Sequence, residues 1–275
     1  MPKHRPDLDR RQYYIDCFLT PNRARLDDPF VLRDGKKHPF AVICPGGAYR
    51  KVCSYIEGVP IARELNRLGY SAVIVYYRVG RKTRLPAPQE DLVWAVREIL
   101  SKAEEWSLEP EGYSVWGLSA GGHLAACFGT KAYGYAKYRL PKPAALVLAY
   151  PVITMEKACT HRLTHDLLLG QDATPAQERS ASVENLVDAE YPPCFLWCGE
   201  ADTSVPPENS RRLVRALEKA GVPFRVEEIP GVGHGVGPGT GTAAEGWIRR
   251  AAEFWEKQRE ESNQPFTAAA FEGIL

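Results

Sequence analysis

The chain has 275 residues, of which 44% are hydrophobic and 25% are charged, and 35 basic against 34 acidic residues leave a net charge of +1. This composition is ordinary for a folded protein, and the length allows one large domain or two small ones. The balanced charge and dispersed basic residues exclude the electrostatic footprint of a protein that binds nucleic acid or an anionic membrane. The N-terminal "MPKHRPDLDRRQYY" lacks the apolar core of a signal peptide and no apolar run has transmembrane length, so we expect a cytoplasmic protein.

Short apolar segments rich in valine, isoleucine and aromatic residues recur along the chain and predict strands. In chain order, they cover residues 40–47, 71–77, 113–116, 145–151, 194–200 and 224–230. Most of these segments are apolar on both faces, as expected of a sheet that helices cover on each side.

Amphipathic segments between the strands predict helices, because their apolar residues are spaced three and four apart. These helices fall, in order, at residues 61–68, 92–100, 213–220 and 243–259. Ser54 and Glu57 have the spacing of a capping box, which predicts a helix start near Ser54. Strands that alternate with helices indicate an α/β fold, a mostly parallel and doubly wound sheet, in one domain spanning residues 1–275.

Two segments interrupt this alternation. Residues 152–190 form a long connection between two strands with few regular signals, and a connection of that length is usually functional or forms a cap. The C-terminal tail, 260–275, turns apolar after Pro265. It could dock on its own domain or on the partner subunit of a homodimer, and both interpretations stay open.

The cysteines and two of the histidines are candidate metal ligands. The seven cysteines are odd in number and lie mostly in apolar segments, which predicts buried free thiols in a reducing compartment. Cys194 and Cys198 are four residues apart on a predicted strand, which is not zinc-finger spacing. His161 and His165 have the i, i+4 spacing of a metal pair, but no third ligand is evident. We therefore expect no metal and no cofactor.

The stretch "SVWGLSAGGHLAA" places Ser119 between two glycines where a predicted strand meets a helical segment. A G-x-S-x-G turn in this position holds the serine in a strained backbone conformation and exposes its hydroxyl at the carboxyl edge of the sheet. The N-terminal amides of the following helix face any negative charge that develops there. The alternative is a glycine-rich turn without chemistry, so the chain must also supply a base and an acid.

A serine hydroxyl becomes a nucleophile when a base accepts its proton and an acid orients that base. Asp202 and His234 follow the last two predicted strands, each in a loop rich in glycine or proline. They also come in the order serine, acid, histidine that such a turn requires. Glu200 is a weaker acid candidate because it lies nearer the strand, and His123 is expected to pack under the site. We therefore predict a catalytic triad of Ser119, Asp202 and His234.

A tetrahedral oxyanion needs hydrogen-bond donors as well. The predicted strand at residues 40–44 ends in "PGGAY", where Gly46 and Gly47 allow backbone N–H groups to approach a substrate oxygen. The amide of Ala120, directly after the serine, is the other expected donor. A simple turn is the alternative for "PGG", but the loop follows the strand that should carry the oxyanion turn.

At these residues the chain resembles an α/β-hydrolase and, more narrowly, the bacterial esterases grouped with bifunctional feruloyl and acetyl-xylan esterases. The resemblance covers about residues 40–255 and rests on "CPGGAY", "YYRV", "GLSAGGHLA", "YPVIT", "ADTSVPPENS" and "GVGHGVG". It implies the same triad and the same oxyanion donors. The chain has Pro45 and Ala48 where such esterases often have a histidine and a third glycine.

The resemblance implies a cofactor-free serine esterase that acts on short acyl esters, with acetylated plant oligosaccharides as the expected substrates. We expect the walls of the substrate pocket to come from the insertion and from Tyr49, Leu118, Val205 and Val236. An amidase or peptidase with the same triad, and a binding protein of the same fold without catalysis, are the alternatives.

Overall fold

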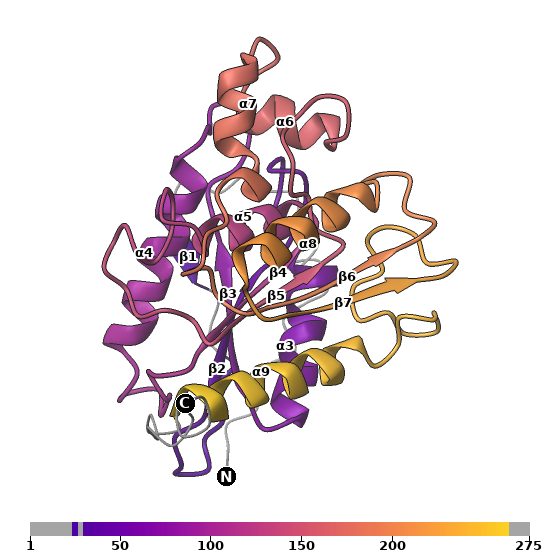
Figure 1. Cartoon of the computed structure of the whole chain (residues 1–275). Coiled ribbons are helices and arrows are strands. Elements are labelled where there is room, and N and C mark those ends of the chain that lie inside the picture. Colours follow the sequence, from indigo (N-terminus) through magenta and orange to yellow (C-terminus); the bar gives the residue numbers. More distant parts are fainter. Residues whose placement is uncertain (1–23, 27–29, 264–275) are drawn as a thin grey trace, which may run out of the picture.

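The computed structural model describes residues 24–26 and 30–263, in which a seven-stranded sheet forms the centre of the molecule. Its strands are β1 (Arg25–Leu26), β2 (Phe40–Cys44), β3 (Ser71–Tyr76), β4 (Ser114–Leu118), β5 (Ala145–Ala149), β6 (Cys194–Gly199) and β7 (Phe224–Ile229). They are ordered β1-β3-β2-β4-β5-β6-β7 (Figure 1). All neighbours pair in parallel except β1, which is antiparallel to β3. The six predicted strands are confirmed, whereas β1 was missed because two residues carry no periodic pattern.

Helices cover both faces of the sheet, which confirms the predicted doubly wound architecture. They include α2 (Ser54–Glu57), α3 (Val59–Arg67), α4 (Ala87–Ser101), α5 (Ala120–Phe128), α8 (Glu208–Ala220) and α9 (Trp247–Asn263). The α3 and α9 helices pack together on one face, while α4, α5 and α8 lie on the other (Figure 1). Within the described ranges, no helix is both long enough and apolar enough to span a membrane.

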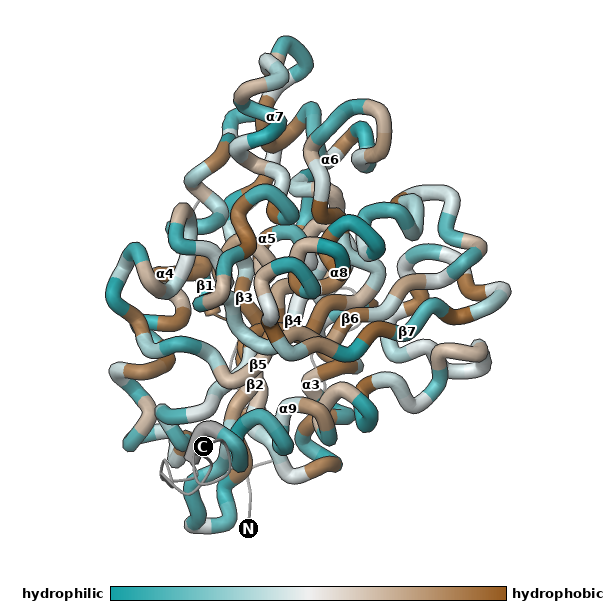
Figure 2. Tube along the Cα trace, viewed as in Figure 1, coloured by the Kyte–Doolittle hydropathy of each residue, from teal (hydrophilic) through white to brown (hydrophobic). Residues whose placement is uncertain are grey.

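The hydrophobic core follows from this layering. Every residue of β2 to β6 is buried, because helices exclude water from both faces of these strands. The edge strand β7 is different, with mostly exposed or half-buried residues. Figure 2 shows hydrophobic residues concentrated along the central strands and hydrophilic ones on the surrounding turns and outer helix faces. The sheet is therefore a rigid support for the loops at its carboxyl edge.

The last helix begins later than predicted, at Trp247 instead of residue 243. Gly239, Gly241 and Gly246 adopt positive φ angles of 74°, 73° and 80°. Of these, Gly246 lies inside the predicted helix, and a right-handed helix cannot run through a residue in that conformation, so α9 begins only after it.

The insertion at residues 152–190 is more regular than predicted. It contains α6 (Arg162–Leu168), α7 (Pro175–Ala181) and a 3₁₀ turn, η1 (Val183–Asn185). A capping box starts α7, where Thr174 and Gln177 bond reciprocally. These helices are too short to show a periodic apolar stripe, which is why the pattern did not reveal them. In Figure 1, α6 and α7 project at one end of the molecule beyond α5, as expected of a cap.

The cysteines inside the described ranges are free thiols, as predicted. Cys44, Cys127, Cys194 and Cys198 are buried, while Cys53 and Cys159 are half-buried. Burial raises the pKa of the Cys127 thiol to about 12 and that of Cys198 to about 11. These two thiols therefore stay protonated at neutral pH and serve packing. Cys17 and most of the C-terminal tail lie outside the described residues.

Candidate active site

Ser119 lies on the sharp turn between β4 and α5, with a positive φ of 53° and ψ of −121°. The flanking glycines are required by close packing. A Cβ atom on Gly121 would lie 2.0 Å from the carbonyl oxygen of Cys44, and one on Gly117 would lie 2.3 Å from that of Gly121. A non-glycine residue held at positive φ in such a tight turn is strained, and strain of this kind clusters at functional sites.

The structure brings together the three residues of the predicted triad. The Oγ atom of Ser119 lies 2.8 Å from Nε2 of His234, and Nδ1 of His234 lies 2.6 Å from Oδ2 of Asp202. Because a carboxylate only accepts hydrogen bonds, Nδ1 carries the proton and Nε2 accepts the serine hydroxyl. Glu200 is exposed and takes no part in this series.

Asp202 is held by the backbone of its own loop. Its Oδ1 atom accepts hydrogen bonds from the N–H groups of Ser204 and Val205, each at 2.9 Å. Its carboxylate is buried, with the whole residue 4% exposed. Two donors on Oδ1 leave only Oδ2 for His234, so the aspartate has a single orientation.

The donors available for an oxyanion differ from the predicted set. The N–H of Gly46 donates to Oε2 of Glu57 at 2.7 Å in the protein interior, so the prediction for Gly46 as an oxyanion donor is wrong. Among the described residues, the amides of Gly47, Ala48 and Ala120 have no hydrogen-bond partner. Gly47 and Ala48 also line the cavity that contains Ser119. No local sequence pattern indicates that the Glu57 carboxylate contacts this loop.

Glu57 connects two loops of the site. Its Oε1 atom accepts a hydrogen bond from the Tyr150 hydroxyl at 3.0 Å, and that hydroxyl accepts the N–H of Gly237 at 3.1 Å. The Tyr150 ring packs edge-on against the His234 ring, with centroids 5.0 Å apart. Burial raises the pKa of Glu57. Its carboxylate thus joins the Gly46 loop to the loop that carries the histidine.

The predicted capping box at Ser54 is wrong because the Glu57 carboxylate bonds Gly46 and Tyr150 and does not reach back to the start of α2. The residue that precedes α2 is Cys53, and it makes no side-chain cap bond. Ser54 is the first helical residue, and the Glu57 carboxylate is engaged by Gly46 and Tyr150 instead. The spacing matched a capping box, but the carboxylate is directed into the site.

The cavity at Ser119 has a volume of about 330 Å³. Its walls combine the oxyanion loop, α2, the insertion and the triad loops, and they include Arg50, Lys51, Ile56, His161 and Leu163. The insertion was predicted to contribute, and His161 and Leu163 bear this out. The cationic side chains and Ile56 were missed, because a sequence does not show which loop residues face inward.

None of the four individually predicted pocket residues lines this cavity. Leu118 is fully buried in β4, and Val205 is buried beneath the loop of Asp202. Tyr49 is buried with its hydroxyl on His123, and Val236 packs against the core. Leu118, Val205 and Val236 are sequence neighbours of triad residues, and Tyr49 follows the PGGA segment, but all four side chains pack toward the core and away from the open space.

His161 and His165 do not form the metal-binding pair that their spacing suggested. Nδ1 of His161 lies 2.8 Å from the Thr164 hydroxyl, whereas His165 bonds Asp166 and Glu178. In the part of the chain that the structure describes, no group of three or more potential ligands is placed to hold a metal.

The BD-FAE family model matches residues 31–217, which is more than half of the chain. The chain belongs to the BD-FAE family. The matched range includes Ser119 and Asp202 and ends before His234, so the histidine is placed by the fold and its hydrogen bonds. The resemblance drawn from the sequence motifs is thereby confirmed.

Individual relatives agree with this membership. The chain is 31% identical to endo-1,4-beta-xylanase B of Butyrivibrio fibrisolvens and 28% identical to an acetylxylan esterase of Xylanibacter ruminicola, over 79% and 71% of its length. It spans only 35% and 40% of the lengths of these curated relatives. It is also 33% identical, with a TM-score of 0.75, to the structure of an acetyl ester-xyloside bifunctional hydrolase from Caldicellulosiruptor lactoaceticus, covering 85% of this chain and 88% of that one. The fold is that of the α/β-hydrolases.

In this BD-FAE member, His123 links the oxyanion loop to the insertion. Its Nε2–H donates to the carbonyl of Ala181 at 2.8 Å, and Nδ1 accepts the Tyr49 hydroxyl at 3.0 Å. Complete burial lowers the pKa of His123 to about 4, so the ring is neutral near pH 7. The expectation that His123 packs under the site is confirmed.

Removing the Glu57 carboxylate should weaken both the fold and the site. In Glu57→Ala, the Gly46 N–H and the Tyr150 O–H would lose their acceptor in the interior. Each such loss costs about 1–3 kcal/mol, partly offset because the buried carboxylate no longer has to be desolvated. We expect the free energy of unfolding, measured by urea denaturation, to fall by about 2 kcal/mol, with a lower kcat.

The matched control is Glu57→Gln, which keeps an oxygen that can accept the Gly46 N–H. It should recover a large part of the lost stability. An alanine variant with the urea midpoint and kcat of the wild type would show that the carboxylate does not anchor these loops.

Proposed function

We propose that this protein is a serine esterase that removes short acyl groups, chiefly acetyl, from plant-derived oligosaccharides. The observation that carries the proposal is the hydrogen-bonded series from Ser119 through His234 to Asp202 at the wall of a cavity. This arrangement turns a hydroxyl into a nucleophile for acyl transfer. The names of the acetylxylan esterase and the acetyl ester-xyloside hydrolase support a sugar ester as substrate.

In the proposed first step, Oγ of Ser119 attacks the ester carbonyl carbon while Nε2 of His234 accepts the hydroxyl proton. Asp202 keeps the histidine ring in place and stabilises the imidazolium. The same Nε2 then gives its proton to the departing sugar oxygen. A water molecule, deprotonated in turn by His234, hydrolyses the acyl-enzyme and restores Ser119.

The negative oxygen of the tetrahedral intermediate would be bound by backbone amides. Ala120 provides one donor at the start of α5, where the helix dipole also favours negative charge. Gly47 and Ala48 provide the others, since both line the cavity and neither amide has a partner among the described residues. Gly46 acts indirectly, by fixing the loop to Glu57.

The size of the cavity favours a small acyl group. A volume of about 330 Å³ is at the low end for ligand pockets, and it must hold the acyl group together with part of the alcohol. Ile56 and Leu163 supply apolar surface beside Ser119, and Arg50 and His161 add polar groups to the wall. A long alkyl chain would exceed this volume and would displace water from Arg50 without replacing its hydrogen bonds.

The test is hydrolysis of 4-nitrophenyl acetate, butyrate and octanoate, alongside acetate release from acetylated xylo-oligosaccharides. We expect kcat/KM to be highest for the acetate and to fall by about 10-fold or more by the octanoate, with acetate freed from the sugars. A preference for octanoate would contradict the short-acyl assignment. Cleavage of acyl anilides without any ester hydrolysis would replace the esterase by an amidase.

A further inference from the structure

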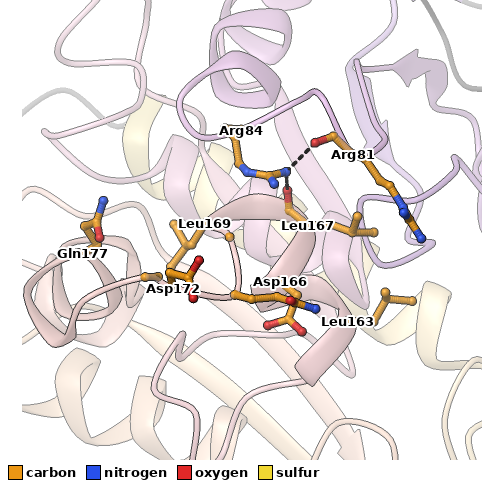
Figure 3. Close-up of a pocket in the computed structure, with 11 residues that line it drawn as sticks. Arg81, Arg84, Leu163, Asp166, Leu167, Leu169, Asp172 and Gln177 are labelled. Atoms are coloured by element: carbon orange, nitrogen blue, oxygen red, sulfur yellow. Dashed lines mark hydrogen bonds between the residues drawn. The ribbon is translucent and has the colours of Figure 1, made fainter.

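A second cavity, of about 630 Å³, lies between the loop after β3 and the insertion. Figure 3 shows it bounded by Arg81 and Arg84 on one side and by Leu163, Leu167 and Asp172 on the others. It is larger than the cavity at Ser119. The catalytic steps proposed above do not use it.

The two cavities meet at α6. Leu163 lines both of them and is 39% exposed, so its side chain borders both spaces. A ligand long enough to extend from Ser119 past Leu163 would reach the second cavity. The insertion also contributes to the walls of both cavities, with His161 in the first and Asp172 in the second.

The walls of the second cavity are held in place by hydrogen bonds between its two sides. The guanidinium of Arg84 donates to the carbonyl of Leu167 at 2.6 Å and to that of Arg81 at 2.9 Å (Figure 3). The N–H of Leu85 also donates to the carbonyl of Leu168 at 3.1 Å. These bonds tie the loop to α6, so the cavity is formed before any ligand arrives, which lowers the entropy cost of binding.

Its polar side chains remain available to a ligand. Arg81, Gln171 and Asp172 line the cavity, and none of the three side chains forms a hydrogen bond or ion pair with another described residue. They combine cationic donors, an amide and an anionic acceptor, while Leu163 and Leu167 provide apolar surface. A sugar ring matches this set, because its hydroxyls both donate and accept and its C–H faces pack on apolar side chains.

Other ligand classes fit less well. A phosphate or sulfate would meet Asp166 and Asp172 in the same cavity, and these carboxylates repel anions. An alkyl chain would bury Arg81 and Gln171 without hydrogen-bond partners. An uncharged carbohydrate encounters neither cost.

We propose that this cavity is a distal subsite that binds sugar residues of the oligosaccharide beyond the one that carries the ester. The inference rests on the proposed esterase function and adds to it a preference for chain length. Arg81 and Asp172 bind hydroxyls of these distal residues, and Leu163 directs the chain from one cavity to the other.

The test compares wild type with the double variant Arg81→Ala/Asp172→Ala on acetylated xylose and acetylated xylotetraose. Both side chains are exposed, so the fold should be retained. We expect kcat/KM for the tetrasaccharide to fall by about 10-fold or more, mainly through KM, because two hydrogen bonds to charged groups are lost. The value for the acetylated monosaccharide, which does not reach the subsite, should stay within about twofold.

The control is Lys82→Ala/Glu111→Ala, which removes the same charges from exposed positions that do not line the cavity. It should keep the wild-type preference for the tetrasaccharide. Equal losses on both substrates, or none on the tetrasaccharide, would overturn the subsite.

Calorimetric titration with unacetylated xylotetraose provides a readout that does not depend on catalysis. Wild type should bind xylotetraose more tightly than xylose, and the Arg81→Ala/Asp172→Ala variant should lose about 10-fold in affinity. Binding that depends on Arg81 and Asp172 in a protein that hydrolyses no ester would refute the esterase and retain the subsite. Ester hydrolysis with affinity unchanged in the variant would refute the subsite alone.

Discussion

Replacing Ser119 with alanine should lower kcat for 4-nitrophenyl acetate by about 10⁶-fold, because nucleophile and base act as a unit. The substitution removes the Oγ atom that lies 2.8 Å from Nε2 of His234. Among the described residues that line the cavity, no other side chain is hydrogen-bonded to that nitrogen. Residual turnover would come from the oxyanion donors and from binding alone. Initial rates at saturating substrate give the measurement.

Two further readouts separate loss of the nucleophile from loss of the fold. The midpoint temperature of thermal unfolding should be little changed or higher, since alanine removes one hydroxyl from a strained position at φ 53°. Mass spectrometry after treatment with a phosphonylating ester should find one adduct on wild type and none on Ser119→Ala. Substantial serine-independent turnover would show that another group carries the reaction.

The second large effect is expected from Asp202→Asn, which keeps the shape of the side chain but changes one acceptor into a donor. The N–H groups of Ser204 and Val205 require an oxygen at the Oδ1 position, so the new NH₂ group faces His234. Nδ1 must then accept instead of donate, which places the ring proton on Nε2. In that tautomer His234 cannot accept the proton of Ser119, and kcat should fall by about 10⁴-fold.

Nuclear magnetic resonance of the histidine ring nitrogens measures the tautomer directly. The protonated nitrogen should be Nδ1 in wild type and Nε2 in Asp202→Asn. If the variant keeps the wild-type tautomer, the backbone of residues 204 and 205 does not set the orientation of the side chain. If it changes tautomer and keeps full activity, His234 is not the base.

The parts of the site that follow from periodicity and chain order were predictable. Strands buried on both faces have continuous apolar sequences, and their carboxyl ends meet at one edge, so Ser119, Asp202 and His234 could be placed together before the fold was known. The glycines at 117 and 121 also carry a local signal, because a tight turn needs them.

Long-range contacts of single side chains were not predictable in this way. Glu57 lies in a segment that matches a capping box, yet its carboxylate bonds Gly46 and the hydroxyl of Tyr150, which is 93 residues away along the chain. Local spacing has no information on such a partner. The prediction of the pocket walls was wrong for a related reason. Apolar residues beside the triad, such as Leu118, pack into the core, and the cavity is lined by loop residues that follow no sequence pattern.

The link from Tyr49 through His123 to the carbonyl of Ala181 limits how this protein can diversify. The end of α7 is attached to the loop that follows β2, so a change that moves residue 181 also disturbs Gly47 and Ala48, the proposed oxyanion donors. The exposed turn at Gln171 and Asp172 carries no such attachment to His123, so substitutions there can alter the second cavity. Substitutions at this turn can therefore change which ligands bind, while the hydrogen bonds through His123 keep the proposed oxyanion donors in place.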